Sequence, residues 1–292
     1  MNNSLIKNLI GVLLATLLGV GVALAGGYQG AEVLGVPIFW LAVAAAYLIN
    51  WIGFVIAFRL KTEKFYDLTG FLSYASVTTA AVLLIPEIDD RAVLLLVMVM
   101  IWTTRLGTFL FTRVIKAGKD DRFDELKVDF GRFLLTWTLQ GLWVTFTAAA
   151  ALAAITATAR KPLGWLDLIG FVIWAFGFGF ELIADAQKSA FRENPVNKGK
   201  FIQSGLWSWS RHPNYFGEIV TWIGVAVIAL PVLKGWALLT LISPLWVIIQ
   251  LVVISGVPLL EKKADERWGD QEDYQAYKKN TPVLIPKPPK KA

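Results

Sequence analysis

The chain has 292 residues, of which 56% are hydrophobic and 17% charged, and its net charge is +6. Soluble domains average about 45–50% apolar and about 25% charged residues, so this composition indicates a membrane protein. It disfavours a disordered or nucleic-acid-binding chain. Cysteine is absent and His212 is the one histidine, which excludes disulfides, thiolate metal sites and multi-histidine sites. We expect no nucleic-acid partner and no metal.

Eight stretches are long and apolar enough, or nearly so, to cross a bilayer as helices, which takes about 20 residues. In chain order they are Leu9–Ala25, Pro37–Phe58, Leu68–Ile85, Ala92–Phe111, Phe133–Ala159, Leu163–Phe180, Ile219–Leu233 and Trp236–Leu260. The seventh is short and turns directly into the eighth, which predicts a hairpin. The expected fold is an all-α, polytopic membrane helix bundle with seven or eight transmembrane helices.

The first span also has features of a cleavable signal peptide. Lys7 precedes its apolar run, and the small residues Ala23-Leu24-Ala25 are followed by two glycines. Both interpretations stay open at this point, and the orientation of the remaining spans is the same in either case.

Lysine and arginine are divided unevenly between the two sides of the predicted spans. One side holds 23 of the 28, the other holds four (Arg91, Arg160, Lys161 and Lys234), and Arg105 lies within the fourth span. Cytoplasmic loops carry such an excess, so both termini, or at least the C-terminus, are predicted to be cytoplasmic. Because the outer loops are short, any chemistry is expected in the bundle or at its cytoplasmic mouth.

The polar residues concentrate between positions 181 and 218, where the sixth span ends and the seventh begins. Pro195 and Gly199 are expected to end one helix, and Pro213 to begin the next with Ser210 or His212 as its cap. The free N–H groups at such a helix start favour an anion.

Two side chains at the start of this predicted helix are functional candidates. Asn214 and Glu218 lie four residues apart and point the same way. An ionisable residue such as Glu218 at the start of an apolar stretch is a candidate by default.

Five basic residues surround this turn, namely Lys188, Arg192, Lys198, Lys200 and Arg211. They suit a phosphate-rich ligand, although attraction to anionic lipid, worth about 1 kcal/mol per basic residue, explains the charge as well. Pairing with Glu181 and Asp185 along a solvated helix end is a further explanation. Downstream, residues 261–269 predict an amphipathic cytoplasmic helix, which either covers the mouth of the bundle or lies on the lipid headgroups.

Three motifs in this region carry a resemblance to a known superfamily: QKSAFR at 187–192, GLW at 205–207 and RHPNYFGE at 211–218. They resemble the C-terminal half of steroid 5α-reductases and sterol C14/C7 reductases, over residues 169–286. Isoprenylcysteine carboxyl methyltransferases share the RHP-x-Y element. The chain looks most like a bacterial and plant branch whose substrates are largely unassigned, which implies a multi-pass protein of the bacterial inner membrane.

The resemblance implies NADPH as the cofactor and assigns residues to it. By similarity, Lys188 and Arg192 contact its phosphates, Trp207 lines its nicotinamide, and Asn214 and Glu218 hold its amide and ribose. The same motifs and the C-terminal helix add Asp185, Arg211, His212, Tyr215, Glu261 and Trp268.

The proton donor is where the sequence departs from the resemblance. Steroid 5α-reductases have a Gln-Glu pair on the second span and a later Tyr, and that pair is absent from this sequence. The candidate catalytic acids are therefore Tyr66, Asp67, Tyr74 and Tyr277. Helix capping by Asp67 and an interfacial position of Tyr66 explain those two residues equally well. Arg105 either pairs with Asp67 or Glu181 or reaches a cofactor phosphate.

Together, these observations predict an NADPH-dependent reductase of a conjugated C=C bond in a lipophilic, steroid-like enone that enters from the membrane lipids. Residues 1–160 would form the substrate side, 161–285 the cofactor-binding membrane domain, and 286–292 a flexible basic tail. The alternatives are an S-adenosylmethionine-dependent lipid methyltransferase and a non-catalytic lipid-binding protein. A Rossmann site is not expected, since Gly177-Phe178-Gly179 lies inside an apolar span.

Overall fold

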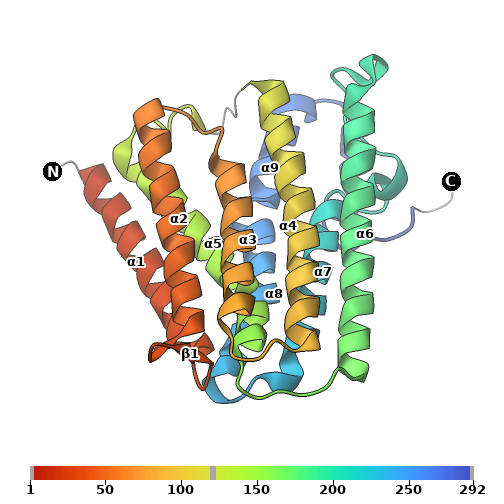
Figure 1. Ribbon diagram of the computed structural model, residues 1–292. Helices are drawn as coiled ribbons and strands as arrows, with labels where there is room; N and C mark the ends of the chain where they lie inside the picture. The colour runs from red at the N-terminus through yellow and green to blue at the C-terminus, as the bar shows by residue number, and fades with distance from the viewer. Residues whose placement is uncertain (1–2, 119–122, 290–292) are drawn as a thin grey trace. The chain divides into compact units, whose positions relative to one another are not determined.

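The structure, a computed structural model, describes residues 3–118 and 123–289 and is nearly all helical (Figure 1). Its α-helices are α1 Asn3–Gly26, α2 Ile38–Leu60, α3 Tyr66–Leu84, α4 Asp90–Ala117, α5 Phe130–Thr156, α6 Trp165–Glu193, α7 Pro213–Ala229, α8 Ser243–Ile248, α9 Val257–Trp268 and α10 Glu272–Asn280. Within the described ranges, eight helical segments are long and apolar enough to cross a membrane. The predicted all-α, multi-pass membrane bundle is confirmed.

The chain divides into two compact units. The first comprises Met1–Asp167 with Ile228–Ser243, and the second comprises Leu168–Val227 with Pro244–Ala292. The division predicted near residue 160 separates a substrate side from a cofactor side, whereas these units are defined by contacts within the chain. The functional division therefore stays a prediction. Of the predicted basic tail, residues 290–292 lie outside the described part of the chain.

The first unit is built around α5, which contacts α1, α2, α3 and α4. Figure 1 shows α2, α3 and α4 in succession, with α5 behind them. In the most apolar stretch of α5, 89% of the residues are buried. The run of alanines at 148–151 and 153–154 explains this position, because small side chains let several helices approach one axis closely.

Ion pairs connect segments that are distant in the chain at each end of the first unit. At one end, the Lys127 ammonium lies 2.9 Å from the carboxylate of Glu63, which is buried. At the other end, Arg91 donates two hydrogen bonds to Asp167, at 2.9 and 2.8 Å, and both side chains are almost fully buried. A buried pair of this kind is stable only because both hydrogen bonds are made.

A short β-hairpin, which the sequence analysis did not foresee, also lies in the first unit. Its strands are β1 Glu32–Val33 and β2 Val36–Pro37, paired antiparallel. Leu34 and Gly35 form the turn with φ angles of +52° and +76°. Two consecutive positive φ angles are typical of the two-residue turns that suit the twist of a hairpin.

In the second unit, α6 and α7 approach each other through glycines. A Cβ atom added to Gly177 would lie 2.5 Å from the backbone nitrogen of Thr221, and one added to Gly217 would lie 2.5 Å from the nitrogen of Glu181. A Cβ atom added to Gly224 would likewise lie 2.5 Å from the backbone nitrogen of Trp174. The glycine in the RHPNYFGE motif therefore has a packing role, and Gly177 lies within a helix rather than in a nucleotide-binding turn.

The eighth predicted span, Trp236–Leu260, is not one regular helix. It consists of a 3₁₀ segment Gly235–Ile242, then α8, a π-helical segment Ile249–Ile254, and the start of α9. The Ser255 N–H bonds to the Gln250 carbonyl, and a Cβ on Gly256 would lie 2.2 Å from the Leu251 oxygen. This glycine allows a tight change of direction, so the amphipathic helix predicted from residue 261 begins earlier, at Val257.

Candidate functional site

The polar segment between α6 and α7 folds as its prolines and glycines predict. Helix α6 ends at Glu193, and the Asn194 side chain then accepts a hydrogen bond from the Val196 N–H at 3.1 Å to start a 3₁₀ turn at Pro195. Gly199 has a φ of +84°, a conformation that favours glycine. Helix α7 begins at Pro213. The predicted helix end and helix start are both confirmed.

Trp207 connects two of the motifs. Its indole N–H donates to the Ala184 carbonyl of α6 at 2.9 Å, and the Gln187 side chain accepts from the Leu206 N–H at 2.8 Å. The Lys188 ammonium lies 4.2 Å from the centre of the Trp207 ring, a cation–π contact. The buried tryptophan thus fixes the position of a cation at the end of α6.

A second junction is centred on the Glu261 carboxylate of α9. Arg211 contacts it at 2.9 and 3.2 Å, and the Nε2 atom of His212 lies 2.8 Å from it. Burial, the largest influence, lowers the pKa of His212. A neutral imidazole that donates from Nε2 leaves Nδ1 as an acceptor, and this buried atom has no hydrogen-bond partner among the described residues.

The C-terminal segment packs against the same turn. The Tyr277 hydroxyl donates to the Trp207 carbonyl at 2.7 Å, and burial raises the pKa of this phenol. The backbone N–H of Arg211 donates to the Pro282 carbonyl at 2.9 Å. The Lys287 N–H donates to the Trp209 carbonyl at 2.9 Å. The chain is thus held against the turn as far as Lys287, within the segment that the sequence predicts to be flexible.

These elements of the second unit surround a cavity of about 500 Å³. Its walls come from the end of α6, the 197–202 loop, the turn before α7, and helices α9 and α10. The basic residues described on its walls are Lys188, Arg192, Lys198, Lys200, Arg211, Lys263 and Arg267. Among the described lining residues, Glu261 is the one carboxylate. The volume is within the range of ligand pockets, and the excess of cations favours an anionic ligand.

Most of the predicted cofactor residues line this cavity: Lys188, Arg192, Trp207, Arg211, His212, Glu261 and Trp268, together with the candidate acid Tyr277. Asp185, Asn214, Tyr215 and Glu218 belong to the same unit, on α6 and α7, but not to the cavity wall. Asp185 and Glu218 are buried, and the Tyr215 ring stacks on His212 with centroids 5.6 Å apart. Their cofactor contacts stay predictions.

The other three candidate acids, Tyr66, Asp67 and Tyr74, lie on α3 in the first unit. The Tyr66 hydroxyl donates to the Thr136 carbonyl at 3.3 Å. Tyr74 is buried with its ring 5.2 Å from that of Trp102. A structural role thus accounts for the tyrosines, and their catalytic role stays a prediction.

Arg105, the charge within the fourth span, also lies in the first unit. Its guanidinium lies 5.6 Å from the centre of the Phe109 ring. Its pairing with Asp67 or Glu181, or its contact with a cofactor phosphate, stays a prediction.

The sequence analysis did not assign Phe201, Lys263, Arg267 or Tyr274 to the site, although all four line the cavity. For Lys263 and Arg267 a signal existed, since their four-residue spacing places them on one side of the predicted amphipathic helix. For Phe201 and Tyr274 no spacing indicates the contact, which is made between segments distant in the chain.

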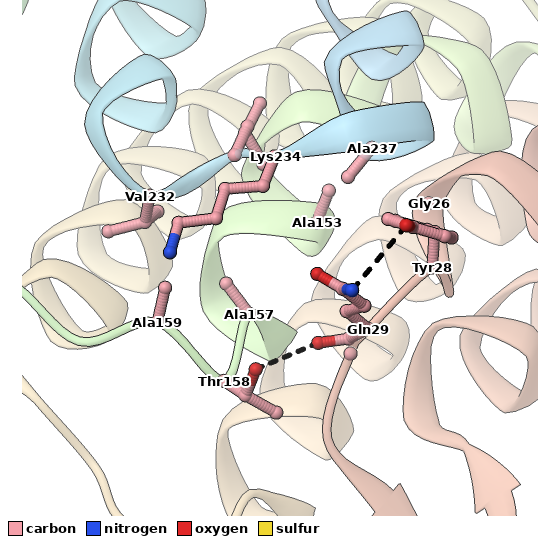
Figure 2. Close-up of a pocket in the computed structure, with 12 residues that line it drawn as sticks. Gly26, Tyr28, Gln29, Ala153, Ala157, Thr158, Ala159, Val232, Lys234 and Ala237 are labelled. Atoms are coloured by element: carbon pink, nitrogen blue, oxygen red, sulfur yellow. Dashed lines mark hydrogen bonds between the residues drawn. The ribbon is translucent and has the colours of Figure 1, made fainter.

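A smaller cavity of about 160 Å³ lies in the first unit (Figure 2). Figure 2 shows the Lys234 side chain along it and the Thr158 hydroxyl donating to the Gln29 carbonyl, at 2.9 Å. Among the described residues that line it, Lys234 carries the one formal charge. Its small size and single cation make it a weaker candidate than the cavity of the second unit.

Comparison with known proteins gives the family. Residues 53–281, most of the chain, match the family described as "Protein of unknown function (DUF1295)". The chain belongs to this family. The DUF1295 match covers residues 188–277, within which all the lining residues of the cavity lie.

The relatives of this DUF1295 protein include steroid dehydrogenases and a probable O-methyltransferase. The chain is 25% identical over 61% of its length to 3-oxo-5-alpha-steroid 4-dehydrogenase 1 of Rattus norvegicus, covering 61% of that protein, and 24% identical to the same protein of Mus musculus, covering 62%. It is 33% identical over 31% of its length to the probable O-methyltransferase ustE of Ustilaginoidea virens, covering 37% of it. The chain thus spans at most about three fifths of these relatives. No solved structure matches it.

Proposed function

We propose that this protein is an NADPH-dependent membrane reductase that acts on a conjugated C=C bond of a lipophilic, steroid-like enone. The observation that carries the proposal is the cavity of the second unit, where seven basic residues and one carboxylate are found among the described lining residues. The similarity to 3-oxo-5-alpha-steroid 4-dehydrogenase 1 supports the same reaction class. The proposed location is the bacterial inner membrane, with the cavity on the cytoplasmic side.

The residues of the cavity fit such a cofactor. NADPH carries a diphosphate and a 2′-phosphate, and Lys188 and Arg192, one helical turn apart on α6, would hold the diphosphate through charge-assisted hydrogen bonds. Trp207 lines the cavity beneath Lys188 and would border the nicotinamide ring. The buried Nδ1 of His212 has no hydrogen-bond partner among the described residues and would accept a hydrogen bond from the carboxamide. When bound, NADPH supplies the hydride.

The reduction also needs an acid that polarises the substrate carbonyl or protonates the enolate. Tyr277 is the candidate in the second unit. Because burial raises its pKa, the phenol stays protonated at neutral pH, so it is suited to donating a hydrogen bond rather than to acting as a base. Its proton now bonds to the Trp207 carbonyl and would have to leave that oxygen to reach a substrate.

A second candidate function is S-adenosylmethionine-dependent methylation of a lipid, which the similarity to the probable O-methyltransferase ustE favours. That cofactor has no phosphate and carries a positive sulfonium. A cavity wall with an excess of cations repels S-adenosylmethionine, whereas the same wall attracts NADPH. The charge of the cavity therefore supports reductase chemistry over methyl transfer.

Thermal unfolding of the purified full-length protein with each cofactor tests the proposal. A ligand at 100 times its Kd stabilises the folded state by about 2.7 kcal/mol, so NADPH should raise the melting temperature by several degrees and S-adenosylmethionine should not. Stabilisation by S-adenosylmethionine alone would refute the reductase. The double variant Lys188→Ala/Arg192→Ala should lose the NADPH effect, and an unchanged effect would refute the role assigned to these two residues.

A further inference from the structure

Two pairs of cations line the cavity of the second unit, one on each of two helices. Lys188 and Arg192 lie four residues apart on α6, and Lys263 and Arg267 lie four residues apart on α9. Residues at this spacing share one side of a helix. The proposed function uses the α6 pair for the diphosphate, so the α9 pair needs a separate explanation.

The two pairs have different surroundings. Lys188 is half-buried and lies over the ring of Trp207, next to the junction of Arg211, His212 and Glu261. The α9 cations are solvent-exposed. The Arg267 guanidinium lies 4.9 Å from the centre of the Trp268 ring, and the Trp268 indole N–H donates to the Gly199 carbonyl at 2.6 Å. Arg267 is therefore held beside the loop that carries Lys198 and Lys200.

An aromatic cluster adjoins the α9 pair. The ring of Phe201 lies 5.9 Å from that of Trp268 and 5.2 Å from that of Tyr274 between centroids, and all three residues line the cavity. Flat, partly apolar surfaces of this kind bind purine rings by stacking. An adenosine at this cluster places its ribose near the α9 cations, and its diphosphate can continue towards α6 and Trp207.

We propose that Lys263 and Arg267 bind the 2′-phosphate of the cofactor and determine the preference for NADPH over NADH. The assignment rests on the proposed function, since it requires a nicotinamide dinucleotide in this cavity. A phosphomonoester has a second pKa of about 6 and therefore carries about 1.5–2 negative charges at neutral pH. The α9 cations with the neighbouring Lys198 and Lys200 supply the positive charge that balances it. NADH lacks this group and makes no use of the α9 pair.

The experiment compares nucleotide affinities of the full-length protein and the double variant Lys263→Gln/Arg267→Gln by isothermal titration. A charge-assisted hydrogen bond contributes about 1.5–3 kcal/mol, so we expect the Kd of NADPH to rise roughly 10- to 100-fold and that of NADH to change less than about threefold. Lys262→Gln is the matched control, because Lys262 lies on the same helix, pairs with Glu266 and is absent from the cavity wall. It should leave both affinities unchanged.

A second measurement uses ligands that differ by the 2′-phosphate alone. The wild-type protein should bind 2′,5′-ADP more tightly than 5′-AMP, and the double variant should lose that difference. Equal weakening of NADPH and NADH in the variant, or no change in either, overturns the assignment. Because the diphosphate is common to both nucleotides, Lys188→Ala/Arg192→Ala should weaken NADPH and NADH alike. Loss of NADPH binding with NADH binding unchanged in that variant would also overturn the assignment, by placing the 2′-phosphate at α6. A wild-type protein that binds neither nucleotide overturns the proposed function itself, which is a distinguishable result.

Discussion

At the scale of single residues, Glu261 joins three parts of the second unit. Its carboxylate contacts Arg211 and His212 before α7, and Arg211 in turn donates to the Thr281 carbonyl at 3.1 Å. The Glu261 side chain is 18% exposed and that of Arg211 11% exposed, so removal of one partner leaves the other charge poorly solvated.

We therefore expect Glu261→Ala to lower the free energy of unfolding by about 3 kcal/mol, within the range for breaking a largely buried ion pair. The matched control is Glu266→Ala on the same helix, whose side chain is 63% exposed and pairs with Lys262 at 3.9 Å. It should change stability by no more than about 0.5 kcal/mol. Chemical denaturation in detergent measures both, and equal losses would contradict a special role of Glu261.

His212 gives a pH dependence whose sign follows from its environment. Burial lowers its pKa in the folded protein below the usual 6.5, despite the opposing effect of Glu261. Above pH 6.5 neither state is protonated here, and as the pH falls below 6.5 the unfolded chain binds a proton before the folded one does. Stability should therefore be full above that pH and decrease below it.

The measurement is the melting temperature between pH 7.5 and 5.5, in the wild type and in His212→Gln. Because His212 is the only histidine of the chain, no other imidazole contributes to the difference. The variant should show a flatter profile over this interval. An identical decrease in both proteins would assign the effect to another group.

At the scale of elements, the close contact of α6 with α7 requires glycine, which has no side chain, at the positions where the two backbones meet. A Cβ on Gly177 would lie 2.5 Å from the Thr221 nitrogen and 2.7 Å from the Gly217 oxygen, which are backbone atoms that cannot move independently. At Gly179, two residues further along α6, nothing lies within 4 Å of the added atom. The two glycines therefore provide a matched pair.

Gly177→Ala should destabilise the protein by about 1–3 kcal/mol, because the two helices must separate to admit the methyl group. Gly179→Ala should be neutral or stabilising by up to about 1 kcal/mol, the difference in helix propensity between the two residues. Thermal unfolding of the two variants decides the question. A loss of equal size at both positions would contradict the close approach as the cause, because nothing lies near Gly179 and alanine has the higher helix propensity.

The elements differ in how far the sequence predicts them. Apolar length identifies the spans, because a bilayer sets the length that a helix needs. Pro195 and Pro213 predict a helix end and a helix start for a local reason, the missing N–H and the fixed φ. The irregular course of residues 235–256 was not predicted, since the segment is largely apolar and carries no charged side chain.

The candidate site shows the same contrast: the sequence predicts its local features but not the contacts between distant segments. The motifs at 187–192 and 205–212 predict the α6 cations, Trp207 and the turn, because these residues are near one another in the chain. The wall formed by Phe201, Trp268 and Tyr274 depends on the hydrogen bond from Trp268 to Gly199, a contact across 69 residues. No periodicity or spacing reports a contact of this kind. The four-residue spacing of Lys263 and Arg267 places both on one side of a predicted helix, but only the structure shows that this side faces the cavity.

At the scale of the whole molecule, the 23 basic residues on one predicted side, against four on the other, predict the orientation in the membrane. In the first unit the sides are physically distinct: Lys127 pairs with Glu63 at one end, and Arg160 pairs with Asp89 at the other, at 3.3 Å. A test of orientation therefore needs one reporter at each end.

The absence of cysteine makes this test direct, since a single introduced thiol is the only one present. Lys64→Cys lies in the loop between α2 and α3, on the cation-rich side, and Lys161→Cys lies in the loop between α5 and α6, on the opposite side. In intact bacterial cells, a membrane-impermeant maleimide should label Lys161→Cys and should reach Lys64→Cys only after permeabilisation. The reverse pattern would place the Lys127–Glu63 end outside. The second unit has its own excess of basic residues at 188–211 and 262–287, which predicts that these segments lie on the same side as Lys64. With the reverse pattern, the cavity would therefore be predicted outside, away from the cytoplasmic NADPH on which the proposed reaction depends.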